Sequence, residues 1–275
     1  MFGSATNISE FLQQWLSTET LPEAEQKILW QYYASYRWHF PPRLQHYYRR
    51  QTDEVMALLR RNPGARVLEI GCGAGTESLW MAMQGAHVDA IELSQARFHT
   101  AMARKVVVER ELGRTLQCHF INETVFDMEV TQPYDLLWME QTFHHLEPRE
   151  AMVDKLASLV RPGGHIVVSE ANGLNPLLQA QLFAQRGFSF KTIRHFEDHL
   201  GRRHPYGDER ILSAHGLSRL FERRGVDRVS IEHFRLFPSS PVFDSLLSWE
   251  EAAPRWLPPL FTHYNYVGVK RSTQA

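Results

Sequence analysis

The first residues in this sequence that suit ligand binding are glycines that end an apolar run. They stand at alternate positions, as Gly71, Gly73 and Gly75. Because glycine has no Cβ, such a loop can bring its backbone N–H groups close to a ligand at the start of a helix. A tight turn between a strand and a helix is the alternative interpretation when the loop is taken alone. The polar residues farther along the chain decide between the two.

Polar side chains follow each of the next apolar runs. Glu92 ends the second run, about twenty residues after the glycines, where a carboxylate can accept hydrogen bonds from ribose hydroxyls. The groups after the third and fourth runs are Asn122, Glu123, Thr124, Glu140, Gln141, Thr142, His144 and His145. In an open α/β sheet, ligands bind beyond the carboxyl ends of the strands. Together these groups would surround a ligand that contains a nucleoside.

The elements that must position these groups alternate between strands and helices. Strands are expected at residues 66–70, 87–93, 116–121, 134–139 and 165–170, with helices between them. A strand at 229–237 and a closing strand at 261–270 are expected to pair antiparallel. The alternation predicts an α/β fold, a doubly wound and mostly parallel sheet of about seven strands with helices on both faces.

Two segments fall outside this alternation. Residues 1–61 have apolar residues at helical spacing and are predicted to form an N-terminal helical lid before a domain that spans residues 62–275. The rhythm is lost at about residues 171–215, which we interpret as an irregular insertion that caps the substrate at the ligand-binding edge of the sheet. Both segments are rich in aromatic residues.

The composition limits the compartment and the partners. A net charge of −1 gives no bias toward nucleic acid or an anionic membrane, so neither is expected as a partner. Two cysteines, Cys72 and Cys118, fit a reducing compartment and argue against a disulfide scaffold. Neither a signal peptide nor a membrane-spanning apolar run is recognisable in the sequence. We therefore expect a cytoplasmic protein, either a monomer or a homodimer.

The order of the motifs resembles that of the class I S-adenosylmethionine-dependent methyltransferases. The motifs that carry the resemblance lie at residues 67–75, 90–94, 134–138 with 144–146, and 159–164. Dinucleotide-binding proteins place the third glycine one residue later, so no pyrophosphate site is implied. The resemblance implies a Rossmann-like fold, S-adenosylmethionine as the cofactor and S-adenosylhomocysteine as its product.

The same resemblance assigns cofactor contacts by position. Gly71 and Gly73 would lie against the methionine part, Glu92 would bind the ribose hydroxyls, and Leu93 would pack on the adenine. At the position after the third strand, where the family more usually has an aspartate, this chain has Glu123. The full set of expected cofactor-binding residues is Glu69, Gly71, Gly73, Gly75, Glu92, Leu93, Glu123, Thr124, Glu140 and Gln141. Hydrogen bonding within the loop is an equal alternative for Glu69.

The expected reaction is methyl transfer to a small molecule, with an oxygen or carbon acceptor favoured. Such acceptors gain from a group that takes their proton, and the candidates are His144, His145 and Glu170. Structural roles in their loops compete with these assignments. The two aromatic segments would form an apolar pocket that excludes water from the acceptor. The residues expected to bind the substrate are Tyr33, Tyr36, Trp38, His39, Phe188 and Phe196.

Other functions stay open at this point. Arginine pairs such as Arg49-Arg50 would suit a nucleic-acid methyltransferase, but the near-neutral charge opposes it. Residues 140–143 also lack the Pro-Pro-Tyr type of signature that amino-methylating enzymes carry there. A protein methyltransferase, or a module that binds the cofactor without turnover, would keep the glycines and Glu92.

Histidine spacing raises the possibility of a metal site. If residues 195–199 were helical, His195 and His199 would share one helix face, with His204 nearby. A well-spaced third ligand is not evident, and such spacings have low specificity. No metal is therefore expected from the sequence.

Overall fold

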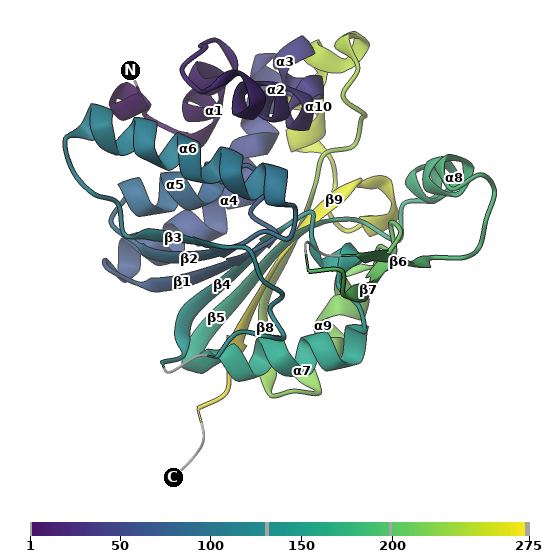
Figure 1. The fold of residues 1–275 in the computed structure, drawn as a ribbon. Helices are drawn as coiled ribbons and strands as arrows, with labels where there is room; N and C mark the ends of the chain where they lie inside the picture. The colour runs from purple at the N-terminus through teal and green to yellow at the C-terminus, as the bar shows by residue number, and fades with distance from the viewer. Residues whose placement is uncertain (1, 130–131, 198–199, 273–275) are drawn as a thin grey trace. The chain divides into compact units, whose positions relative to one another are not determined.

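The computed structural model describes residues 2–129, 132–197 and 200–272, and the chain forms two compact units, Met1–Met128 and Glu129–Ala275 (Figure 1). Seven strands form one sheet in the order β3-β2-β1-β4-β5-β9-β8. The order runs out from β1 in one direction and from β4 in the other, as in a doubly wound sheet. The predicted α/β class and strand number are confirmed.

The strands of the first unit run parallel to one another. They are β1 (Arg66–Ile70), β2 (His87–Ile91) and β3 (Cys118–Ile121). Val67 pairs with Val88, and Val88 with Cys118, and all three side chains are buried. Helices α5 (Thr76–Met83) and α6 (Gln95–Leu112) connect the strands, and the Ser94 hydroxyl caps α6.

The N-terminal helices belong to this same unit. They are α1 (Ile8–Leu16), α2 (Glu23–Tyr32), α3 (Ala34–Trp38) and α4 (Pro42–Arg61), after a short 3₁₀ turn, η1 (Phe2–Ser4). The Asn7 side chain accepts hydrogen bonds from the N–H groups of Ser9 and Glu10 and so caps the N-terminus of α1. Helix α1 packs against α4 and α5, and α2 packs against α6. Residues 1–61 therefore share a core with the helix that follows the glycines.

The second unit contains a mixed half of the sheet. Strands β4 (Tyr134–Glu140) and β5 (Val160–Ala171) are parallel, and α7 (Arg149–Leu159) connects them. Strand β9 (His263–Lys270) pairs antiparallel with both β5 and β8 (Val226–Phe234), and α9 (Ala214–Glu222) precedes β8. The predicted antiparallel closing pair is confirmed. Strand β5 begins earlier than predicted, because Val160 already pairs with Tyr134 before the register shifts.

The segment at residues 171–215 is more regular than the sequence predicts. It contains α8 (Pro176–Gln185) and a two-stranded antiparallel sheet of β6 (Ile193–Glu197) and β7 (Arg203–Gly207). The prediction of irregular chain is wrong because these strands are short and mostly exposed, so they lack an apolar periodicity. His195 lies on β6 and not on a helix, so the possible pairing of His195 with His199 on one helix face loses its basis. His199 itself lies outside the described residues.

The remaining elements are short. They are η2 (Phe143–His145), η3 (Pro241–Leu246), α10 (Leu247–Ala252) and η4 (Pro258–Leu260). The last three occupy the proline-rich stretch between β8 and β9. Across the described ranges, we find no helix that combines the length and apolar character needed to cross a bilayer.

Candidate functional site

The loop after β1 requires glycine for its backbone conformation. Gly71, Gly73 and Gly75 have φ angles of 75°, 55° and 77°, in the left-handed region that other residues rarely adopt. The N–H groups of Gly71 and Cys72 both donate to the Ile91 carbonyl at 2.9 Å, which anchors the loop to the end of β2. The alternate-residue glycine pattern thus reflects three left-handed positions in one anchored loop.

Glu92 lies at the end of β2 with its carboxylate buried against this loop. One oxygen accepts a hydrogen bond from the Gly73 N–H at 3.0 Å. The other accepts from the Ser94 N–H at 2.7 Å and from Arg97 Nη2 at 2.9 Å. These donors hold the carboxylate in one orientation at the point where the glycine loop, β2 and α6 meet.

The end of β3 also reaches this point. The Asn122 side chain donates to the Glu92 carbonyl at 2.6 Å, so the residues after β1, β2 and β3 are brought together as predicted. The predicted adenine-binding residues nearby differ in exposure. Leu93 is half-buried, Glu123 is exposed, and Thr124 is buried with its hydroxyl accepting from the Phe126 N–H at 3.0 Å.

Three other predicted cofactor residues have internal hydrogen bonds. The Glu69 carboxylate is buried and accepts a hydrogen bond from the Ser78 hydroxyl, which matches the alternative that the sequence leaves open for it. In the second unit, Gln141 has a positive φ of 45°, and its N–H donates to the Ser169 carbonyl at 2.9 Å. Glu140, the last residue of β4, is half-buried, and its carbonyl accepts a hydrogen bond from the Thr142 hydroxyl at 2.8 Å.

An aromatic residue of α2 covers the glycine loop. A Cβ at Gly73 would come within 2.2 Å of the Tyr32 hydroxyl, so the tyrosine occupies the space that the glycine leaves. The Arg97 guanidinium lies 5.6 Å from the centre of the Tyr32 ring. Arg97 was not predicted from the sequence, although its place in the first turn after the Ser94 cap puts it next to Glu92. It is a residue that only the spatial arrangement identifies.

Buried polar contacts fix α5 to the N-terminal helices. The predicted substrate residue Tyr33 is buried, and its hydroxyl donates to the Thr76 hydroxyl at 2.8 Å, so in the structure it supports the loop. Arg104, fully buried, donates to the Ala74 carbonyl at 2.6 Å and to the Thr76 hydroxyl at 2.8 Å. Burial also raises the pKa of Glu77, although the hydrogen bond from Tyr48 and the charge of Arg104 oppose that rise.

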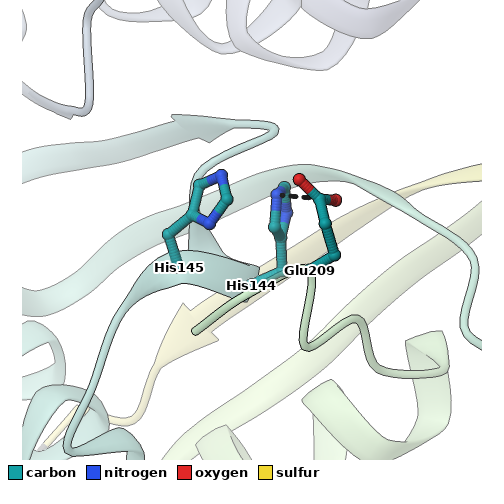
Figure 2. A group of neighbouring side chains, drawn as sticks. All are labelled: His144, His145 and Glu209. Atoms are coloured by element: carbon teal, nitrogen blue, oxygen red, sulfur yellow. Dashed lines mark ion pairs between the residues drawn. The ribbon is translucent and has the colours of Figure 1, made fainter. Parts of the chain in front are cut away.

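The second unit brings together the three residues predicted to be catalytic. His144 and His145 lie on η2 directly after β4, and Glu170 lies near the end of β5. His144 Nδ1 is 2.7 Å from a Glu170 carboxylate oxygen, and the His144 N–H donates to the other oxygen at 3.3 Å. A fourth residue, Glu209, was not predicted, and its carboxylate lies 3.6 Å from His144 Nε2 (Figure 2).

Burial and charge act in opposite directions on this cluster. Burial by itself would lower the pKa of His144, but the nearby carboxylates of Glu170 and Glu209 outweigh it, and the net shift is upward. Burial would likewise raise the pKa of Glu170, but the charge and hydrogen bonds of His144 lower it overall. Burial and the charge of His144 lower the pKa of His145. The two adjacent imidazoles therefore differ in their affinity for protons.

The β6–β7 hairpin is fastened to η2. Tyr206 and Leu146 form an isolated antiparallel bridge, and the Gly207 carbonyl lies 2.7 Å from His145 Nδ1. A Cβ at Gly207 would come within 2.1 Å of the His144 carbonyl oxygen, so glycine permits this close approach. These contacts position Glu209, two residues beyond Gly207, beside the histidines.

The other predicted substrate residues are divided between the two units. Trp38 is 74 % exposed, and Tyr36 and His39 are half-buried. In the second unit, Phe188 is 71 % exposed and packs edge-on against Phe183, whereas Phe196 packs against Tyr206 on the hairpin. Their role in binding a substrate stays a prediction.

Comparison with known sequences identifies related proteins. A family model described as a methyltransferase domain matches residues 43–231. The ubiquinone biosynthesis O-methyltransferase of Xylella fastidiosa is 35% identical over 111 residues, which are 40% of this chain and 43% of that protein. The protein of the same name from Aromatoleum aromaticum is 32% identical over 127 residues, 46% of this chain and 51% of that protein. The chain spans about half the length of these curated relatives.

Comparison with solved structures supports the fold. The magnesium protoporphyrin IX methyltransferase of Synechocystis PCC 6803, with bound S-adenosylhomocysteine, has a TM-score of 0.54 and 16% identity, over 94% of this chain and 92% of that one. The 1,6-didemethyltoxoflavin N1-methyltransferase of Burkholderia thailandensis has a TM-score of 0.51 and 15% identity, over 93% of each chain. At such low sequence identity, the similarity to these structures concerns the fold alone. The shared fold confirms the predicted Rossmann-like architecture.

Proposed function

Because this chain belongs to the methyltransferase-domain family, we propose that it transfers a methyl group from S-adenosylmethionine to an oxygen atom of a small molecule. The curated relatives are named as O-methyltransferases of ubiquinone biosynthesis, which favours an oxygen acceptor. The near-neutral net charge of −1 also favours a small acceptor over a nucleic acid. S-adenosylhomocysteine would be the second product.

The position of Glu92 carries this proposal. Its carboxylate is buried at the carboxyl end of β2 and accepts a hydrogen bond from the Gly73 N–H of the glycine loop. A carboxylate at this place in an α/β sheet is suited to the hydroxyls of a ribose. We assign Gly71 and Gly73 to the methionine part of the cofactor, and Arg97 to the orientation of Glu92.

The remaining cofactor contacts follow the family pattern. Leu93, Glu123 and Thr124 would bind the adenine, and Glu140 and Gln141 would lie near the amino group and the sulfonium. Glu69 is left out of this set, because its carboxylate already accepts a hydrogen bond from Ser78. The aromatic side chains of residues 171–215 would contribute to the acceptor pocket.

The chemistry requires an acceptor oxygen in line with the methyl carbon. Positioning alone can supply up to about 7–11 kcal/mol in favourable intramolecular reactions. A hydroxyl also has to lose its proton, and a group that assists this step contributes about 10²–10⁴-fold. We assign this assistance to the cluster of His144, His145 and Glu170, which lies where β4 and β5 end.

The cofactor assignment is tested by calorimetric titration of S-adenosylhomocysteine into the Glu92→Ala variant. Loss of hydrogen bonds to a charged group is worth about 1.5–3 kcal/mol, so the affinity should fall by roughly 10- to 150-fold. Asp89→Asn is the matched control, since Asp89 is a half-buried carboxylate on the same strand that pairs with His119. Unchanged affinity in Glu92→Ala would place the ribose elsewhere.

Turnover is tested with methyl-tritiated S-adenosylmethionine and a panel of phenols, catechols and other hydroxylated metabolites. The proposal expects release of S-adenosylhomocysteine together with label on one of these acceptors, identified by mass spectrometry. Label found only on RNA or protein would reject a small-molecule acceptor. Tight cofactor binding with no transfer to any acceptor would favour a non-catalytic binding module.

A further inference from the structure

The side chains of His144, His145 and Glu209 converge in the second unit (Figure 2). One nitrogen of each imidazole and one carboxylate oxygen lie within 4.8 Å of one another. His144 is buried, and the other two side chains are partly buried. We propose that these three residues bind a divalent transition-metal ion of the zinc type.

In each of the two histidines, Nδ1 faces an acceptor of the protein. His144 Nδ1 faces a Glu170 carboxylate oxygen at 2.7 Å, and His145 Nδ1 faces the Gly207 carbonyl at 2.7 Å. Both partners are acceptors, so each Nδ1 donates a hydrogen bond, and Nε2 is the ring atom that a metal ion would take in place of a proton. A carboxylate or backbone carbonyl behind each ring is the arrangement found around histidines that bind metals.

The donor set selects the class of ion. Two imidazole nitrogens and one carboxylate oxygen suit zinc, cobalt and iron(II), whereas calcium and magnesium prefer sites made of oxygen atoms alone. Three protein ligands leave at least one coordination position open. A divalent cation would also compensate the negative charge of Glu170 and Glu209, which lie beside the same imidazole, that of His144.

Only small side-chain movements are needed to form the site. Ligand atoms about 2.0–2.2 Å from a tetrahedral zinc ion are roughly 3.3 Å apart. His144 Nε2 and the Glu209 carboxylate are already 3.6 Å apart, and the whole set spans at most 4.8 Å. Rotation of the partly buried Glu209 and His145 side chains can close the remaining difference.

The backbone holds the ligands in place from two separate segments. Tyr206 and Leu146 bridge the hairpin to the chain after η2, and Glu209 has a φ of 52°, which a residue other than glycine rarely adopts. Arg210, the next residue, pairs with Glu147 near η2. The Arg210 guanidinium, although close in sequence to Glu209, therefore forms its ion pair with Glu147.

Metal binding does not depend on the proposed methyl transfer. A bound ion would supply Lewis acidity and lower the pKa of a hydroxyl that takes its open position. That use of the ion rests on the proposed function, whereas the binding of the ion can be measured on its own. The metal site and the methyltransferase function can therefore be tested, and rejected, independently of each other.

The experiment titrates Co²⁺, and then Zn²⁺ in competition, into the full chain after treatment with a chelator. We expect one equivalent of Co²⁺ to give the visible ligand-field absorption of a nitrogen- and oxygen-ligated site, and Zn²⁺ to displace it. Glu209→Gln and His145→Gln should each weaken binding at least 100-fold. Glu170→Gln should weaken it about 10- to 100-fold, because it replaces the charged acceptor behind His144 by a neutral amide.

His195→Gln is the matched control, since His195 is an exposed histidine on the same hairpin. It should leave the affinity and the spectrum unchanged, and circular dichroism should confirm that every variant is folded. The proposal is overturned if the parent chain binds no Co²⁺ at millimolar concentration, or if Glu209→Gln and His145→Gln bind as tightly as His195→Gln does. Methyl transfer without metal binding would overturn this site and leave the proposed function standing. Metal binding without methyl transfer would support this site and overturn the proposed function.

Discussion

At Gly75, both the backbone conformation and the packing of the core require a residue without a side chain. Its φ is 77°, and it stands at the N-cap of α5. A Cβ at this position would come within 2.7 Å of the Phe120 ring and 3.0 Å of the Ala101 Cβ. Alanine therefore meets both an unfavourable backbone conformation and a steric conflict in the core of the first unit.

We predict that Gly75→Ala lowers the free energy of unfolding by about 2–4 kcal/mol, as the sum of left-handed strain and overpacking. Its affinity for S-adenosylhomocysteine should fall as well. Gly64→Ala is the matched control, because Gly64 has a φ of 78° and no atom within 4 Å of an added Cβ. Urea titrations should show a smaller loss for Gly64→Ala. Equal losses would mean that the core around Phe120 accommodates the methyl group.

Helix α5 illustrates the scale of the element. It begins at the glycine loop, and α4 supports it through the hydrogen bond from the Tyr48 hydroxyl to the buried Glu77 carboxyl. Burial raises the pKa of Glu77, and the hydrogen bond from Tyr48 partly offsets this rise. The hydrogen bond from Tyr48 of α4 thus affects the ionisation of Glu77 on α5, the helix that follows the glycine loop.

We predict that Tyr48→Phe lowers the free energy of unfolding by about 1–3 kcal/mol near neutral pH. A raised pKa in the folded state gives a contribution that is complete below the unfolded value of about 4.3 and is lost as the pH rises through the folded value. Since the substitution removes a contact that lowers this pKa, its effect should grow from low to neutral pH.

Denaturant titrations at several pH values measure this dependence. The control is the same substitution in a Glu77→Gln background, which has no carboxyl to titrate, and there the effect of Tyr48→Phe should not vary with pH. A pH-independent effect in the parent background would show that the Glu77 carboxyl does not change its ionisation in this range.

At the scale of the whole molecule, the N-terminal helices are part of a compact unit. The unit spans Met1–Met128, and Trp15 of α1 is fully buried with the Arg104 guanidinium 4.5 Å from its ring. Phe11 lies 5.7 Å from Trp80 of α5. The predicted boundary between a lid at residues 1–61 and a domain at 62–275 therefore cuts through a shared core.

We predict that a chain of residues 62–275 loses cooperative unfolding of its first unit and binding of S-adenosylhomocysteine. Each large aromatic side chain removed from a core costs about 3–5 kcal/mol, which is a large part of a total stability of about 5–15 kcal/mol. Thermal unfolding followed by circular dichroism provides the measurement. A truncated chain that keeps the parent midpoint would establish residues 1–61 as a detachable lid.

The sequence alone determines the alternating strands and helices, the glycine loop and the place of Glu92. These features depend on apolar periodicity, on backbone conformations that only glycine readily adopts, and on the rule that parallel strands end at one edge. Each is a local property that neighbouring residues report. The sheet and the contact between Gly73 and Glu92 confirm those predictions.

Only the tertiary structure decides which polar groups meet across long stretches of chain. The pairing of Arg104 with Thr76 and the approach of Glu209 to His144 leave no periodic trace, because each joins segments far apart in the sequence. The hairpin that carries Glu209 was missed because its short, exposed strands lack an apolar pattern. Its position depends on backbone contacts with η2, whose formation requires the rest of the unit to be folded.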